Sequence, residues 1–240
     1  MGFFFFNGII DPVQPFEIDG EEAHHILSSR RIQLDEIISI QDRSSKRYLS
    51  KLISKSRRQV TLQVVEEESV PPEPELKIDL FQAVVKEKAL DHIIQKTTEL
   101  GVHRVILFES AYSQAVKGTF EKKLERWQRV AFEACKQCGR AKPPNILYFK
   151  SVDEALAVRQ TKLNFMLDIP GEPIGKSLPI TEDSQINLFI GPEGGWKKDE
   201  LPKEGFMRLG LGPRILRADT AAISSIAIFQ FLFGDLTAPC

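Results

Sequence analysis

The feature that most limits the fold of this chain is the regular alternation of apolar runs and helical patterns after Leu76. Continuous apolar runs, which predict strands buried on both faces, occupy residues 78–85, 105–108, 146–149, 163–169 and 186–190. Apolar residues at helical spacing occupy residues 90–100, 124–138 and 221–233, and the first two patterns end at a glycine. Residues 207–209 predict a last short strand. This alternation predicts an α/β domain with a mostly parallel sheet, and the almost wholly apolar last helix is expected to be buried.

The first seventy residues follow a different pattern. Short β-branched runs at 37–40, 48–53 and 59–64 predict strands, and residues 20–27 predict one helix with Asp19 as its N-cap. Strands at this spacing favour a small β-barrel. Residues 66–75 combine three prolines with many carboxylates, which is typical of a stiff, solvated linker. We therefore predict two domains, residues 1–72 and residues 73–240.

The composition is that of an ordinary globular protein, with 42% hydrophobic and 27% charged residues. No apolar run approaches the ~20 residues that a membrane helix needs, and the apolar start lacks the basic region of a signal peptide. Three cysteines, an odd number, argue against a disulfide framework. We expect a cytoplasmic protein without a membrane partner. Cys135 and Cys138 lie on the apolar face of a predicted helix, which favours core packing over a metal site, so no metal is expected.

Positive charge is concentrated between residues 43 and 65, although the formal net charge is only −1. The stretch holds seven basic residues and no acidic one. They are Arg43, Lys46, Arg47, Lys51, Lys55, Arg57 and Arg58. Such a surface could neutralise several phosphates of a nucleic acid, and a solvated hairpin would carry the same charges. Charge alone leaves both interpretations open.

Two glycine-rich segments could carry chemistry. Gly191-Pro192-Glu193-Gly194-Gly195-Trp196 directly follows an apolar run, where loops of α/β sheets bind ligands, although tight turns have the same composition. Residues 209–221 read Leu-Gly-Leu-Gly-Pro-Arg-Ile-Leu-Arg-Ala-Asp-Thr-Ala. They lack the third glycine of a dinucleotide fingerprint, and the chain has no Walker A motif. Asp219 or Thr220 could also simply cap the last helix.

Together these two segments resemble the cofactor loops of the RsmE family, which methylates N3 of a uridine in small-subunit (16S) ribosomal RNA. The resemblance also covers residues 22–27, 95–102, 125–129 and 139–140, and so nearly the whole chain. It implies a PUA-like, RNA-binding β-barrel followed by a SPOUT methyltransferase domain whose end forms a trefoil knot. It further implies S-adenosyl-L-methionine as cofactor, 16S rRNA or the small ribosomal subunit as partner, and a homodimer that uses the terminal helix.

The resemblance also assigns residues. The cofactor-binding residues that it implies are Leu167, Gly191, Pro192, Glu193, Gly194, Leu209, Gly210, Leu211, Gly212, Ile215, Leu216, Thr220 and Ala221. Arg217 is the candidate donor to the charge that develops on uracil, or a phosphate clamp, and Asp219 is a candidate proton acceptor. The candidate RNA contacts are Arg30, Arg31, Arg43, Lys46 and Arg47. The chain departs from the family's usual Thr and Glu at Ala218 and Asp219.

Three alternatives stay open. The same fold could methylate another RNA position, such as a ribose 2′-hydroxyl. The departures at Ala218 and Asp219 could instead mark a non-catalytic RNA-binding assembly factor. A nucleotide-dependent oxidoreductase would need the complete glycine fingerprint, which this chain lacks.

Overall fold

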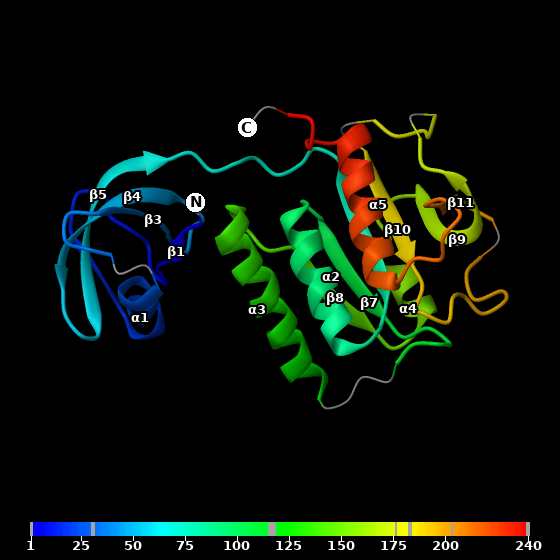
Figure 1. Ribbon diagram of the computed structural model, residues 1–240, viewed down its shortest axis with the longest axis horizontal. Coiled ribbons are helices and arrows are strands. Elements are labelled where there is room, and N and C mark those ends of the chain that lie inside the picture. The colour runs from blue at the N-terminus through cyan, green and yellow to red at the C-terminus, as the bar shows by residue number, and fades with distance from the viewer. Residues whose placement is uncertain are drawn as a thin grey trace. The chain divides into compact units, whose positions relative to one another are not determined.

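The computed structural model describes residues 2–29, 32–114, 119–175, 177–181, 184–202 and 204–238. The chain divides into two compact units, each drawn in Figure 1. The first unit comprises residues 1–72 and 135–142, and the second comprises residues 73–134 and 143–240. The sequence did not indicate that residues 135–142 belong with the first seventy.

The first unit is a five-stranded sheet with one helix. Its elements are β1 (Phe4–Phe5), β2 (Phe16–Asp19), α1 (Gly20–Ser29), β3 (Ile37–Gln41), β4 (Arg47–Lys55) and β5 (Gln59–Glu68). The strand order is β1-β3-β4-β5-β2, and only the β1–β3 pair is parallel. The three predicted strands and the predicted helix are confirmed, whereas β1 and β2 were not predicted. Alternate residues of the long strands, such as Ile40, Leu52 and Leu62, point into one core.

The prediction that residues 66–75 are all linker was wrong at its start. Glu66, Glu67 and Glu68 continue β5 and pair with residues 47–49 of β4. Glu68 Oε2 accepts a hydrogen bond from Ser39 Oγ at 2.5 Å. Strand pairing and this contact therefore override the low strand propensity of three consecutive glutamates.

The second unit is built on a six-stranded sheet in which every pair is parallel. Its elements are β6 (Lys77–Ala83), α2 (Glu87–Glu99), β7 (Arg104–Phe108), α3 (Phe120–Cys138), β8 (Asn145–Phe149), α4 (Val152–Ala157), β9 (Asn164–Pro173), β10 (Gln185–Ile190), β11 (Phe206–Gly210) and α5 (Ala218–Phe233). The strand order is β11-β9-β10-β6-β7-β8. The predicted parallel α/β sheet and its strands are confirmed. Only the short helix α4, capped by Ser151, was missed.

Helices cover both faces of this sheet, and this explains the apolar runs of its strands (Figure 1). Leu80 packs into a core with Trp127 of α3 and Phe229 of α5. Its neighbour Phe81 points to the other face, where it joins Phe189 and residues of α4 in a second core. Because consecutive side chains of a strand alternate between faces, a strand covered twice must be apolar throughout.

The terminal helix differs from its prediction in two respects. It is buried along one face only, by residues such as Ala222, Ile226 and Phe229, whereas Phe231 is 60% exposed. Its N-cap is Arg217, which makes no side-chain capping bond, and neither Asp219 nor Thr220 is the cap. The Asp219 carboxylate instead accepts from the Thr220 backbone N–H at 2.8 Å.

The two cysteines that were expected in the core differ in burial: Cys135 is buried and Cys138 is exposed. Among the described residues, no group of His, Cys, Asp and Glu side chains is arranged to hold a metal ion. None of the helices in the described ranges is long and apolar enough to cross a membrane.

Candidate active site

A cavity of about 420 Å³ lies where β10 and β11 end, beside the middle of β9. These three strands are neighbours and parallel, and loops that follow the carboxyl ends of such strands commonly bind ligands. The lining residues come from the middle of β9, the end of β10, the two glycine-rich segments and the first turn of α5. The volume falls in the range of small-molecule sites.

Trp196 holds the loop after β10 in place. The indole Nε1 donates to the Leu167 backbone oxygen at 3.1 Å, and the ring stacks on Phe108 with the ring centroids 6.2 Å apart. A side chain at Gly191 would place its Cβ 3.1 Å from the indole, so glycine lets the ring lie directly on the backbone. The loop therefore folds back over the middle of β9 and presents backbone atoms to the cavity.

The second glycine-rich segment forms the opposite wall. Leu209 is buried at the end of β11, while Leu211, Ile215 and Leu216 line the cavity. Gly210 serves a packing role, because a Cβ there would lie 2.8 Å from the Gly171 carbonyl oxygen on β9. Gly212 has a φ of +87°, a backbone conformation that only glycine adopts without strain.

The structure brings together most of the predicted cofactor residues. Those that line the cavity are Leu167, Gly191, Pro192, Glu193, Gly194, Leu209, Leu211, Ile215, Leu216 and Ala221. Gly210, Gly212 and Thr220 do not line it. They border a separate cleft of about 410 Å³ along α5, together with Ser224 and Ile228.

Several lining residues were missed by the sequence analysis. They are Asp168, Ile169, Ile190, Gly195, Trp196, Arg214 and Ala218. Most lie within the quoted loops or directly beside them, so a prediction by whole segment would have found them. Asp168 lies within the apolar run 163–169 and pairs with Arg208 of β11, Oδ2 to Nη1, at 2.9 Å. This ion pair fixes a carboxylate in the cavity wall, a fact that strand patterning does not reveal.

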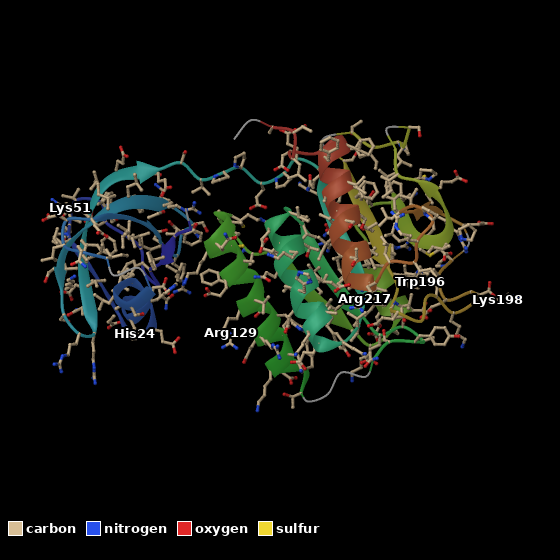
Figure 2. The ribbon with its side chains drawn as sticks, in the orientation of Figure 1. His24, Lys51, Arg129, Trp196, Lys198 and Arg217 are labelled. Atoms are coloured by element: carbon tan, nitrogen blue, oxygen red, sulfur yellow. The ribbon has the colours of Figure 1, made fainter. Side chains whose placement is uncertain are left out.

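The two candidate catalytic residues stand beside the cavity and do not line it. Arg217 is exposed at the start of α5, and Trp196 lies in the loop after β10 (Figure 2). Asp219 is partly buried, with its Oδ2 3.9 Å from His92 Nδ1 on α2. Both belong to the helical turn whose Ala218 and Ala221 do line the cavity.

Three of the five candidate RNA contacts lie in the part of the chain that the structure describes. Arg30 and Arg31 lie outside the described residues. Arg43 is exposed, and Lys46 Nζ lies 3.8 Å from the Glu67 carboxylate.

The prediction that Arg47 contacts RNA disagrees with the structure, since only 3% of the residue is exposed. Its Nη2 donates to Gln41 Oε1 at 2.9 Å and to the Gly139 carbonyl oxygen at 2.8 Å. The guanidinium also lies 4.3 Å from the centre of the Phe3 ring. Burial lowers the pKa of this guanidinium, and the charge of Glu68 opposes the shift. Arg47 is therefore a structural residue of the first unit.

Comparison with known proteins identifies the class of the molecule. Residues 72–230 match the RNA methyltransferase domain family, and residues 18–65 match the RNA methyltransferase PUA domain family. The first match covers more than half of the chain. A parallel sheet with a cavity at its strand ends, preceded by a PUA-type domain, thus defines an RNA methyltransferase of this two-part kind.

The relatives narrow this class to one family. The chain is 31% identical to ribosomal RNA small subunit methyltransferase E of Bacillus subtilis over 92% of each chain. The S-adenosyl methionine-bound crystal structure of the enzyme of that name from Neisseria gonorrhoeae has a TM-score of 0.85 at 28% identity, over 99% of this chain and 100% of the other. A putative methyltransferase from Legionella pneumophila, solved with its bound cofactor SAM, has a TM-score of 0.86 at 29% identity, over 97% and 98%. The chain belongs to the ribosomal RNA small subunit methyltransferase E family.

Proposed function

We propose that this protein transfers a methyl group from S-adenosyl-L-methionine to N3 of a uridine in 16S ribosomal RNA. The observation that carries the proposal is the cavity in which both glycine-rich segments meet at the carboxyl edge of the sheet. The bound S-adenosylmethionine in two solved structures of similar fold supports the choice of cofactor. The RNA substrate follows from family membership.

The residues of the cavity fit S-adenosylmethionine. Leu167, Leu211 and Leu216 offer an apolar surface for a flat adenine ring, and the glycines leave backbone N–H and C=O groups within reach of a ligand. Asp168 and Glu193 supply carboxylates that could accept hydrogen bonds from ribose hydroxyls or the amino group. The thirteen residues implied by the resemblance therefore remain our proposal for the cofactor site, with Gly210 and Gly212 acting through the backbone path.

We further propose the knotted SPOUT arrangement for residues 73–240, with residues 1–72 as the RNA-binding domain. The strand order supports the knot. β10 lies on one side of β9, and the chain returns after β10 to place β11 on the other side. Gly171 and Gly210 allow β9 and β11 to approach closely where the returning segment enters. A closed loop through which the end of the chain passes would produce this order.

The chemistry requires two things of the protein. When bound, S-adenosylmethionine supplies a methyl group on a positively charged sulfur. The proton on uracil N3 must leave, and the negative charge that moves onto the ring oxygens needs a fixed donor. We assign the donor role to Arg217, whose guanidinium offers several N–H donors in a fixed fork, and proton acceptance to Asp219. The cavity walls exclude water and hold the reacting groups in line.

We also propose that the protein works as a homodimer in the cytoplasm, where its ribosomal substrate is found. The exposed side of α5 supports the dimer. A cleft bordered by Thr220, Ser224 and Ile228 runs along it, and Phe231 is 60% exposed further on. An apolar face of this kind is typical of a contact surface. A monomer in sedimentation at micromolar concentration would count against the dimer.

The first experiment is a calorimetric titration with S-adenosylmethionine, with NADH as control. Saturable binding at one site per chain supports the cofactor assignment, and incubation with 16S rRNA or small subunits then allows the product to be mapped. A ribose-methylated product would indicate the alternative target. Cofactor binding without methyl transfer would indicate an assembly factor.

Arg217→Ala tests the mechanism. We expect kcat to fall by about 100-fold or more, as for the loss of one donor to a developing anion, with the melting temperature unchanged. Full activity in this variant would remove Arg217 from the mechanism.

A further inference from the structure

One exposed aromatic side chain stands beside the candidate active site without a role in the mechanism above. Tyr112 follows β7, one strand of the same parallel sheet, and is 54% exposed. Most large apolar side chains of the second unit are buried in its two cores. An exposed aromatic ring at the functional edge of a sheet therefore calls for an explanation.

Tyr112 lies against the cofactor loop. A Cβ built on Gly194 would be 2.9 Å from the Tyr112 Cβ and 3.3 Å from its Cγ. Gly194 itself lines the cavity. Glycine at this position thus allows the tyrosine to pack directly on the loop, against a residue that lines the cavity.

The turn that carries Tyr112 is held in place from several sides. The Ser110 backbone N–H donates to Ser113 Oγ at 3.0 Å, and the Ser113 N–H donates to the Ser110 carbonyl oxygen at 3.0 Å. The Ala111 N–H donates to Glu200 Oε1 at 2.7 Å, and the other oxygen of Glu200 accepts from the Lys197 N–H at 2.9 Å. Glu200 therefore ties the turn to the segment that continues the cofactor loop. A backbone fixed in this way loses little entropy when a ligand binds to its side chain.

The cavity wall also has exposed apolar groups. Ile169, in the middle of β9, is 57% exposed, and Ile215, in the second glycine-rich segment, is 89% exposed. Both line the cavity, and Tyr112 packs on Gly194, which lines it as well. Exposed apolar groups of this kind suit a flat, uncharged ring better than a phosphate or a sugar.

The reaction requires such a ring at this place. In an in-line displacement, the accepting nitrogen must approach the methyl group from outside the cofactor cavity. A nucleobase that leaves its RNA stack to reach the cavity loses its stacking energy, and aromatic side chains commonly replace that contact. We propose that the Tyr112 ring is the stacking surface for the pyrimidine base presented to the cofactor cavity, an inference that rests on the proposed RNA methylation.

The decisive measurement is photocrosslinking, because it needs no turnover. 16S rRNA transcribed with 5-iodouridine is irradiated in complex with the full-length protein, and crosslinked peptides are mapped by mass spectrometry. We expect a crosslink at Tyr112 in the wild type and at the same position in Tyr112→Phe, with loss of that crosslink in Tyr112→Leu. Crosslinks that form only elsewhere would overturn the proposal.

Kinetics with the same three proteins provide the second readout. Tyr112→Phe keeps the ring and should stay near wild type, whereas Tyr112→Leu keeps apolar bulk but should lose about 5- to 100-fold in kcat/KM for RNA, the worth of one stacked base. S-adenosylmethionine affinity should be unchanged in both. Equal behaviour of the Phe and Leu variants would contradict a stacking role. A wild type that crosslinks at Tyr112 but never methylates RNA would refute the proposed function and leave the stacking surface in place.

Discussion

The sequence predicted two binding regions in this molecule, and the residues of these two regions are arranged differently in the structure. The two glycine-rich segments, separated by residues 197–208, converge on one cavity. The basic residues between positions 43 and 58 lie close together in the sequence, yet Arg47 is buried and Lys46 and Lys51 lie near carboxylates. Glycine patterns report on the path of the backbone. A count of charges does not tell which of them already have internal partners.

The basic region nevertheless keeps a possible contact surface. Arg57 and Arg58 are exposed and, with His24, Gly20 and Asp19, border an open cleft of about 650 Å³ on the first unit. Figure 2 labels His24 on α1 and Lys51 on β4. Lys51 Nζ lies 2.7 Å from Asp35 Oδ1, so its charge is partly neutralised. We therefore propose this cleft, in place of Arg47, as a phosphate-binding surface.

The largest effect is expected when the buried member of the basic region is removed. Arg47→Ala leaves the Gly139 carbonyl and Gln41 without their charged donor, and should lower the free energy of unfolding by about 3 kcal/mol. Urea denaturation measures this. The RNA affinity of the folded fraction should stay constant. Arg43→Ala is the matched control, since Arg43 is exposed and its loss should leave stability unchanged. Similar stability of the two variants would refute the structural role of Arg47.

A substitution in the cavity should have the opposite effect: it should lower the ligand affinity and leave the stability of the fold unchanged. Ala221 is half-buried in the first turns of α5 and lines the cavity. Ala221→Leu adds bulk there with little loss of helix propensity. It should weaken S-adenosylmethionine binding by about 10- to 100-fold, because the longer side chain occupies part of the space of the ligand and each tenfold corresponds to about 1.4 kcal/mol. Calorimetry measures the affinity. Ala227→Leu, further along the same helix, should bind normally; an equal loss in both would place the ligand elsewhere.

The exposed arginines give a smaller, salt-dependent effect. If Arg57 and Arg58 each contact one phosphate, the double alanine variant should reduce the slope of log affinity against log salt by about two. Filter binding of 16S rRNA between low and physiological salt determines the slope. Lys51→Ala should change it less, because Asp35 already neutralises that lysine. An unchanged slope in the double variant would show that the cleft does not face RNA.

The smallest effect concerns a carboxylate between α2 and α3. Burial raises the pKa of Asp91, and the nearby Lys123 opposes the shift. A raised folded-state pKa favours the protonated form, so this contribution is present below the unfolded value of about 3.9 and is lost as the pH rises through the folded value. Asp91→Asn also removes the ion pair with Arg126, so the shift is tested by the trend alone: relative to wild type, the variant should gain less than about 1 kcal/mol over that rise. Melting temperatures between pH 3 and pH 7 test the sign, and the opposite trend would contradict it.

The fold was largely predictable because its signals are repeated. Most strands of the parallel sheet are dominated by apolar residues, and each long helix of the second unit has a buried stripe that includes residues such as Ile94 and Ile226. The predictions were wrong where a single tertiary contact determines the local structure. Ser39 and the pairing with β4 extend β5 into an acidic run, and solvent on one side of α5 exposes Phe231.

The site was predictable in its backbone and not in its side chains. Glycine spacing and the resemblance pointed to both loops, but the roles of Gly210 and Gly191 depend on Gly171 and Trp196, which approach them only in the folded chain. Tyr112 gave no signal, because one aromatic residue in a polar turn has no periodicity. The reason to consider Tyr112 is its contact with Gly194, which exists only in the folded chain.

The grouping of residues 135–142 with the first seventy has a consequence for dissecting the protein. The Arg47 guanidinium and the Gln41 amide donate to the carbonyls of Gly139 and Ala141, and the Glu22 carboxylate lies 3.0 Å from Lys136 Nζ. A fragment that stops at residue 72 would lack these partners. The amino-terminal module is therefore discontinuous in the gene, so it cannot be transplanted to another protein by a single cut, and recombination between relatives should preserve both pieces together.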